Sequence, residues 1–123
     1  MTGRYDEWAV ARTPALLAFA SALVEDPRVA DAAVAKALAR TRAAWARHSH
    51  DDPDLEARRR VVRACSTPRR AAVVLRVLEE RSDAEIAEVL GCRPGTVRGY
   101  ASRALATLRI ELTNDHASEG ARS

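Results

Sequence analysis

The sequence predicts an all-α protein in which a helical bundle is closely fused to a C-terminal helix-turn-helix. Three observations lead to this fold class. No segment of the 123 residues alternates apolar and polar residues as a strand does. Each of the five prolines follows a residue that can cap or precede a helix, and four of those residues are Thr or Asp. Between the prolines, apolar residues recur at spacings of three and four, as on one face of a helix.

The proline signals predict helix starts near residues 14, 27, 53, 68 and 94. A short helix over residues 4–12 leads into the one at Pro14, with or without a break. In the N-terminal half the apolar spacing predicts two buried faces. Their members are Leu16, Phe19, Ala20 and Leu23 on the first, and Ala30, Val34, Ala37, Leu38, Thr41 and Trp45 on the second.

Residues 82–112 are typical of a helix-turn-helix. Ser82 and Glu85 have the spacing of a capping box, which starts a helix at residue 83. Gly91 suits the left-handed end of that helix, and Pro94 suits the first turn of the next. A plain helical hairpin would share this pattern, but helix lengths, caps and anchors together favour the DNA-binding type. The residues expected to hold the two helices together are Ala87, Gly91 and Val97. The expected apolar stripe of the first helix is Ile86, Ala87 and Leu90. That of the second helix is Val97, Ala101, Ala104, Leu105 and Leu108.

The outer face of the second helix is basic. From Arg93 to Arg109 there are four arginines and no acid. An arginine side chain can donate two hydrogen bonds to guanine or to a phosphate group. Thr and Ser hydroxyls can hydrogen-bond with bases or with phosphate. Gly95 and Gly99 weaken the helix but let its backbone come close to a partner. The alternative is a solvated basic face. A helical projection directs these residues away from the core: Thr96, Gly99, Ser102, Arg103 and Ala106, flanked by Arg98 and Arg109.

Composition excludes several classes of protein. The formal net charge is +3 and the pI about 9.4, with a single lysine among the basic residues. This arginine-rich composition has two alternative explanations: contacts with phosphate or carboxylate groups, or the base composition of the source genome. No apolar run is long enough for a membrane helix, and the N-terminus is no signal peptide. We therefore expect a cytoplasmic protein.

Other candidate sites are weak. Cys65 and Cys92 form no CxxC pattern, so we expect reduced thiols and no zinc. The polar segment His48–Asp52 offers metal-ligand types but is equally typical of a loop. No nucleophile–base set suits catalysis, so we expect neither an enzyme nor a cofactor. The arginines at positions 58, 59, 60 and 63 either touch phosphate or form a solvated face paired with Asp54 and Glu56.

The stretch PRRAAVVLRVLEERSDAEIAEVLGCRPGTVRGYASRALATLR lies within Pro68 to Leu112. This segment resembles region 4 of the extracytoplasmic-function sigma factors, although LuxR-type regulators share its AEIAEVLG…GTV core. Tyr5 to Ala64 resembles region 2 of the same family, more weakly. The resemblance implies two parts: a region 2-like bundle at 1–65 and a region 4-like domain at 66–112. The short polar segment 113–123 is expected to be a disordered tail. It also implies binding to core RNA polymerase and recognition of an upstream promoter element in the major groove. By motif position, the DNA-binding residues would be Arg93, Thr96, Arg98, Gly99, Ser102 and Arg103.

Two departures from the family matter. Its acidic-and-amide contact helix for the polymerase is altered here, with Ala32, Ala35 and Lys36 where the family has an acid, an amide and an acid. The long linker between the two regions is reduced to residues 65–67, which span at most about 11 Å at ~3.6 Å per residue. Two promoter elements lie more than one ~34 Å turn of DNA apart, so the halves cannot straddle them. We expect one compact body in which the helices at Pro53 and Pro68 pack together.

Three hypotheses follow. The first is a sigma-like transcription regulator that binds double-stranded DNA but lacks complete promoter-melting activity. The second is a sigma mimic that binds an anti-sigma factor or RNA polymerase through its helical surfaces. The third is a minimal functional sigma factor. No heptad seam or large unexplained apolar stripe defines an oligomeric state.

Overall fold

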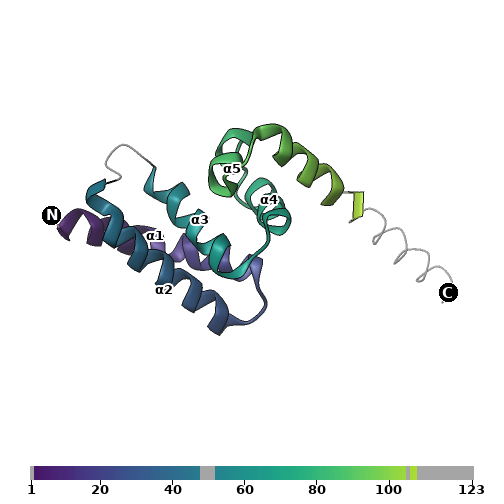
Figure 1. The fold of residues 1–123 in the computed structure, drawn as a ribbon. Helices are drawn as coiled ribbons and strands as arrows, with labels where there is room; N and C mark the ends of the chain where they lie inside the picture. Colours follow the sequence, from purple (N-terminus) through teal and green to yellow (C-terminus); the bar gives the residue numbers. More distant parts are fainter. Residues whose placement is uncertain (1, 48–51, 105, 108–123) are drawn as a thin grey trace.

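The computed structural model describes residues 2–47, 52–104 and 106–107 (Figure 1). Within these ranges the chain is helical, with no strand, which confirms the all-α prediction. The helix that follows α5 covers residues 94–104 and continues at 106–107; below it is called the C-terminal helix. The other elements are α1 Thr2–Leu23, α2 Pro27–Ala44, the 3-10 turn η1 Trp45–Arg47, α3 Pro53–Cys65, α4 Pro68–Val77 and α5 Asp83–Leu90.

Three helices begin where the prolines predict. α2, α3 and α4 start at Pro27, Pro53 and Pro68. In each case the side chain of the preceding residue accepts a backbone N–H from the first turn, which satisfies a donor that the helix itself leaves unpaired. These capping residues are Asp26, Asp52 and Thr67. The C-terminal helix likewise begins at residue 94.

Of the two alternatives at Pro14, the structure shows the continuous one: α1 runs through Pro14 without a break, so no separate helix starts there. Proline lacks the N–H that would bond the carbonyl of Val10. Val10 lies at the surface, 78% exposed, so water can donate a hydrogen bond to its carbonyl in place of the missing N–H. Tertiary contacts on both sides of the proline hold the helix in one piece, with Tyr5 buried before it and Leu16 after it.

An aromatic cluster fixes the N-terminal part of α1 against α2 and η1. The rings of Tyr5, Trp8 and Trp45 lie with their centroids 5.5–6.1 Å apart. The Tyr5 hydroxyl donates to the carbonyl of Leu38 at 2.9 Å, and the Trp8 indole donates to the Asp54 carboxylate at 2.7 Å. Such aromatic contacts add stability beyond the area they bury, so this cluster ties α1 to α2 and α3.

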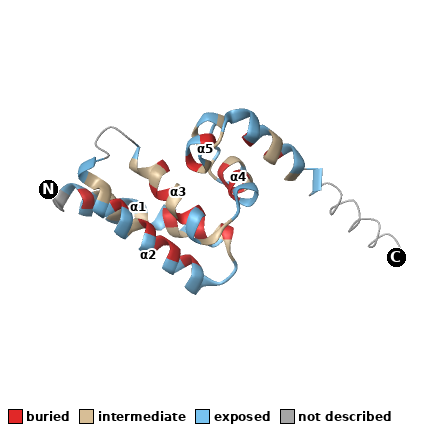
Figure 2. Cartoon of the chain, in the orientation of Figure 1, coloured by how far each residue is buried: buried red, intermediate tan, exposed pale blue. Residues whose placement is uncertain are grey.

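Most predicted core residues are confirmed, as the buried faces in Figure 2 illustrate. Leu38, Trp45, Leu90 and Ala104 are only half-buried. Leu105 and Leu108 lie outside the described side chains, and the predicted tail at 113–123 lies outside the described residues. No core residue was predicted in α3 or α4, yet Val61 and Leu75 are fully buried. The predicted residues that are buried are Leu16, Phe19, Ala20, Leu23, Ala30, Val34, Ala37, Thr41, Ile86, Ala87, Val97 and Ala101.

The core is continuous from the bundle into the helix-turn-helix. One hydrophobic cluster includes Leu16 of α1, Val61 of α3 and Val97 of the C-terminal helix. α3 packs against α1 and α2 on one side and against α5 on the other, and α4 packs on α1 and α5. The direct packing expected between the helices that start at Pro53 and Pro68 is therefore not the main contact. The extended backbone of Ser66 redirects the chain between α3 and α4. As a result, α5 rather than α4 packs against α3.

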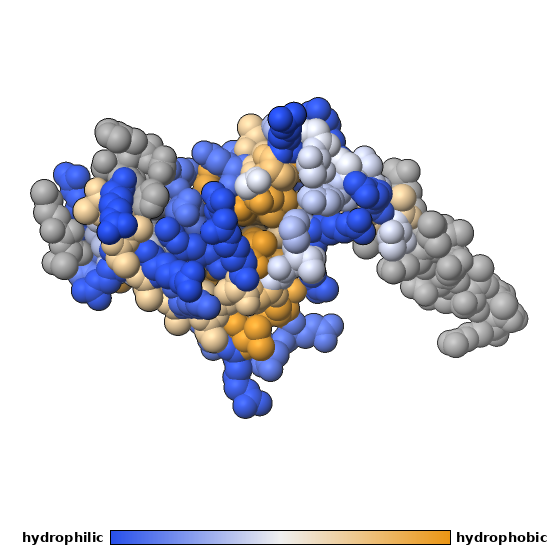
Figure 3. Space-filling model, viewed as in Figure 1, coloured by the Kyte–Doolittle hydropathy of each residue, from blue (hydrophilic) through white to orange (hydrophobic). Residues whose placement is uncertain are grey.

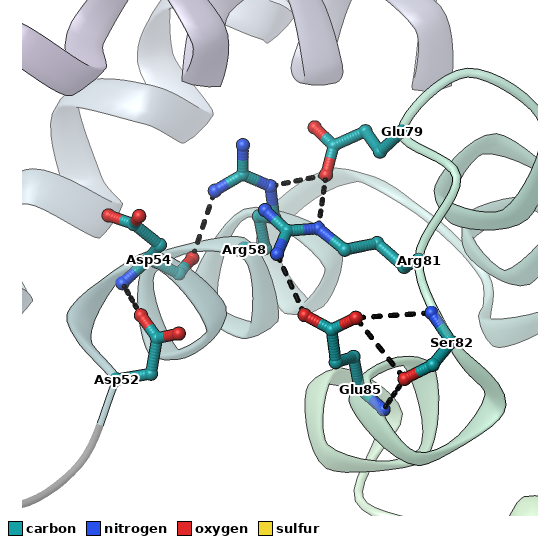
Figure 4. Close-up of polar contacts among 7 residues, drawn as sticks. All are labelled: Asp52, Asp54, Arg58, Glu79, Arg81, Ser82 and Glu85. Carbon is teal, nitrogen blue, oxygen red and sulfur yellow. Dashed lines mark hydrogen bonds and ion pairs between the residues drawn. The ribbon is translucent and has the colours of Figure 1, made fainter.

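A polar network crosses this junction (Figure 4). Arg58 of α3, with only 6% of its side chain exposed, donates to Glu79 at 2.6 Å. Glu79 also accepts from Arg81 at 3.2 Å, and Arg81 reaches Glu85 of α5 at 3.0 Å. The Arg58 guanidinium also lies 5.8 Å from the centre of the Phe19 ring. This network orients α5, and with it the helix-turn-helix, on α3.

Candidate nucleic-acid interface

The turn between α5 and the C-terminal helix has helix-turn-helix geometry. The Ser82 hydroxyl accepts the Glu85 N–H at 3.2 Å and the Glu85 carboxylate accepts the Ser82 N–H at 3.1 Å, so the predicted capping box is confirmed. Gly91 ends α5 with φ +67°, in the left-handed region where glycine has no Cβ penalty. The Cys92 N–H bonds back to the Ala87 carbonyl at 3.0 Å, and Val97 is fully buried. The three predicted anchors thus hold the two helices together.

The six residues predicted to bind DNA lie on one helix and its first turn. The Arg93 carbonyl accepts N–H groups from Thr96 and Val97, at 3.0 and 3.3 Å, and so starts the helix. One side of this helix is buried through Val97 and Ala101, and most of its remaining described surface is exposed, as Figure 2 shows. Four of the other predicted residues are exposed and Gly99 is half-buried; the exposed ones are Thr96, Arg98, Ser102 and Arg103.

Arg103 folds back along its own helix. Its Nε donates to the Gly99 carbonyl at 3.2 Å, and its guanidinium lies 5.9 Å from the centre of the Tyr100 ring. A Cβ on Gly99 would stand 3.2 Å from the Arg103 Nη2, so the missing side chain at Gly99 makes room for this arrangement. The guanidinium is therefore held along the exposed face and is positioned before any partner binds.

Asp83, which the sequence reasoning missed, lies beside this surface. Its carboxylate pairs with Arg76 of α4, and its second oxygen lies 3.8 Å from the Arg98 Nη1. Arg98 keeps 66% of its side chain exposed. Asp83 is the first residue of α5, where the helix dipole also favours a negative charge. An acid in the first turn of α5 was visible in the sequence, but its pairing with residues on two other helices was not.

Two titratable groups in the motif have shifted pKa values. Hydrogen bonds from the Ser82 backbone and from Arg81 lower the pKa of Glu85 below its usual 4.5. Burial raises the pKa of the Cys92 thiol in the turn. A protonated thiol is a poor nucleophile and a poor metal ligand. The chemistry offered by this surface is therefore that of cationic and hydroxyl hydrogen-bond donors.

The arginines of α3 do not form one phosphate-binding cluster. Arg58 is buried against Glu79, and Arg60 pairs with Glu56 at 3.3 Å. Arg59 approaches the turn at Gly91, and Arg63 is exposed elsewhere. Of the polar segment 48–52, only Asp52 is described, and it caps α3.

Residues 57–108 match the family model described as Sigma-70, region 4. The match spans most of α3, all of α4 and α5, and the C-terminal helix. It supports a relationship to the sigma-70 family and a DNA-binding helix-turn-helix in a sigma-like protein of transcription regulation. It begins within α3, earlier than the Pro68 start of the region 4 resemblance in the sequence.

Comparison with curated proteins and comparison with solved structures gave no match. In the part of the chain that the structure describes, no helix combines the length and the apolar character needed to cross a bilayer. The sigma-like assignment therefore depends on the region 4 match and on the geometry of the helix-turn-helix.

Proposed function

We propose that this protein is a sigma-factor-like transcription regulator of extracytoplasmic-function ancestry that acts in the cytoplasm and binds double-stranded DNA through its C-terminal helix. One observation carries this proposal. The second helix of a motif that matches sigma-70 region 4 has an exposed basic face, with no acid between residues 93 and 109. Arginines on such a helix neutralise phosphates and release counterions, which favours binding to DNA.

The six residues divide into three roles in this proposal. Arg98 and Arg103 stand toward opposite edges of the exposed face and fork onto guanine or phosphate. Thr96 and Ser102 supply short hydrogen bonds to base edges or backbone. Gly99 has no side chain, so the helix backbone can come close to the DNA at that point. Arg93 contacts phosphate at the start of the helix.

We further propose that the protein does not act as a complete promoter-melting sigma factor. On the surface of α2, Ala32, Ala35 and Lys36 are exposed where the family has an acid, an amide and an acid. Only Ser66 and Thr67 separate α3 from α4, and the helix-turn-helix packs on the bundle. A region 2-like half and a region 4-like half joined in this way cannot reach two promoter elements more than one ~34 Å turn apart.

DNA binding is tested by fluorescence anisotropy with the full chain and labelled duplexes of randomised sequence, without polymerase. We expect the duplex pool to bind at low salt and repeated selection to enrich one motif. A labelled single strand of the same length should bind more weakly, because it lacks the major groove that a helix enters. Absence of duplex binding at low salt would contradict the proposal.

Polymerase binding separates the remaining hypotheses. Co-migration with core RNA polymerase on a sizing column, followed by strand opening at a selected promoter, would support the minimal sigma factor and contradict the incomplete one. Migration alone, with duplex binding retained, is the expected result. A protein-binding mimic is a second candidate, because the surface between α2 and α3 is hollowed and combines cations with apolar side chains, which suits a protein partner.

A further inference from the structure

Two adjoining hollows lie between α2 and α3, away from the helix-turn-helix. Their volumes are about 310 and 320 Å³. Both are lined by Lys36 of α2 and Ala64 of α3, so they adjoin at these two residues; the pair is called the α2–α3 groove below. Its lining includes four alanines, Ala32, Ala33 and Ala37 of α2 and Ala64 of α3.

One half of the α2–α3 groove is strongly basic. Four cations line it, against the single acid Glu56. Arg60 is held in place by Glu56 at 3.3 Å and by the Thr41 hydroxyl at 3.1 Å. The other three cations are exposed and make no ion pair within the described part of the chain; they are Lys36, Arg40 and Arg63. This half therefore carries positive charge that no neighbouring residue balances.

The other half of the groove is mainly apolar. Val29, 43% exposed, lies there with Ala32 and Ala33, and Arg28 stands at its edge. Figure 3 shows the mixture of hydrophilic and apolar surface on the molecule, with hydrophilic residues over much of the face that α2 and α3 present in that view. The combination of an apolar half and a basic half limits what the groove can bind.

We propose that the α2–α3 groove docks an acidic amphipathic segment of a partner protein. Carboxylates of the segment would pair with Lys36, Arg40 and Arg63, where arginine's fork matches a carboxylate. Apolar side chains of the same segment would cover Val29 and the alanines around it. A nucleic-acid backbone would satisfy the basic half but would leave the apolar half in water, so a peptide fits the groove better. This surface is separate from the proposed DNA-binding helix. The inference rests on the second candidate function, the protein-binding mimic, and names the chemistry of its partner.

A random peptide library displayed on phage tests this proposal with the full chain as bait. We expect enrichment of peptides that combine several Asp or Glu residues with apolar residues. Synthetic forms of the enriched peptides should bind more weakly as salt rises. The double substitution Lys36→Glu with Arg63→Glu should weaken binding by at least about tenfold, because it replaces attraction with repulsion. Arg69→Glu with Arg70→Glu, which reverses two exposed arginines on α4 outside the groove, is the matched control and should leave binding unchanged.

The outcomes distinguish this proposal from DNA binding by the C-terminal helix. Arg98→Ala and Arg103→Ala should leave peptide binding unchanged, and Lys36→Glu should leave duplex binding at the helix largely intact. Three results would overturn the docking site. They are no enrichment, enrichment of peptides without acidic residues, and peptide binding that survives Lys36→Glu with Arg63→Glu. Displacement of the peptide by a single-stranded oligonucleotide in the Arg98→Ala, Arg103→Ala background would assign the groove to nucleic acid instead.

Discussion

At the scale of single residues, local chemistry determines the turn of the motif. Gly91 adopts φ +67° at the end of α5, and its place was predictable because a left-handed residue is needed there. Arg58 and Asp83 were not predictable as buried or paired residues. Arg58 reaches Glu79 across 21 positions of the chain and Asp83 contacts Arg76 and Arg98 on neighbouring helices, so no local pattern marks either of them.

The turn is most sensitive at Gly91. Replacing Gly91 with Ala should lower the free energy of unfolding by about 1–2 kcal/mol, the cost of a left-handed residue with a Cβ. A Cβ there would also stand 3.2 Å from the Arg59 Nη2. Urea denaturation measures the effect. Gly95→Ala is the control, since its Cβ meets only Arg98 at 3.7 Å; equal stability of the two variants would contradict this account of the turn.

In the proposed complex with DNA, Asp83 would compete with phosphate for the Arg98 guanidinium. Asp83→Asn should therefore raise the affinity for duplex DNA several-fold at low salt, because it removes a negative charge 3.8 Å from the Arg98 guanidinium. Anisotropy titration measures the change. Glu88→Gln, an exposed acid on the same helix, controls for the general loss of negative charge. An unchanged or lower affinity in Asp83→Asn would show that Asp83 does not compete for Arg98.

At the scale of elements, caps and prolines predicted where most helices begin. Asp26, Asp52, Thr67 and Ser82 all cap helices as their residue types predict. The exception is Pro14, where contacts on both sides of the proline override the local signal. How the helices pack depends on contacts between residues far apart in the sequence. For this reason the sequence alone predicted α4 as the partner of α3, whereas the structure packs α5 against α3.

The cap of α5 should make stability depend on pH. Hydrogen bonds from Ser82 and Arg81 lower the pKa of Glu85 in the folded protein. The stabilisation is therefore present above the usual pKa of 4.5, and is lost as the pH falls through the lower folded value. Glu85→Gln should lose less stability than the wild type when the pH falls below 4.5, in urea titrations at several pH values. Glu88→Gln should follow the wild type; identical curves for all three proteins would refute this role of the cap.

At the scale of the whole molecule, α3 joins the bundle to the helix-turn-helix. The sequence predicted a boundary near residue 65 between a region 2-like bundle and a region 4-like domain. This boundary stays a proposal about the ancestry of the two parts. In the structure one hydrophobic cluster runs from Leu16 to Val97, and α3 contributes to both sides of it. We therefore expect the two parts to unfold as one cooperative unit.

A core substitution in the helix-turn-helix tests this unity. Ile86 of α5 is fully buried, and Ile86→Ala should cost about 3 kcal/mol through lost burial and a cavity. The chain's two tryptophans, Trp8 and Trp45, both report on the bundle. The midpoint of their fluorescence change in urea should fall together with that of helix content by circular dichroism. An unchanged tryptophan midpoint would mean that the helix-turn-helix unfolds independently.

The central claim is that the exposed arginines of the C-terminal helix bind DNA. The most direct test is the salt dependence of duplex binding for the wild type, Arg98→Ala, Arg103→Ala and a control, Arg4→Ala. Arg4 is exposed in the first turn of α1, and the N-terminal end of α1 lies far from the C-terminal helix (Figure 1). Each substitution in the helix should weaken binding at least about fivefold, and should lower the slope of log affinity against log salt by ~1 where the arginine contacts phosphate. Arg4→Ala should match the wild type. If the helix variants bind with wild-type affinity and slope, the C-terminal helix is not the DNA-binding surface.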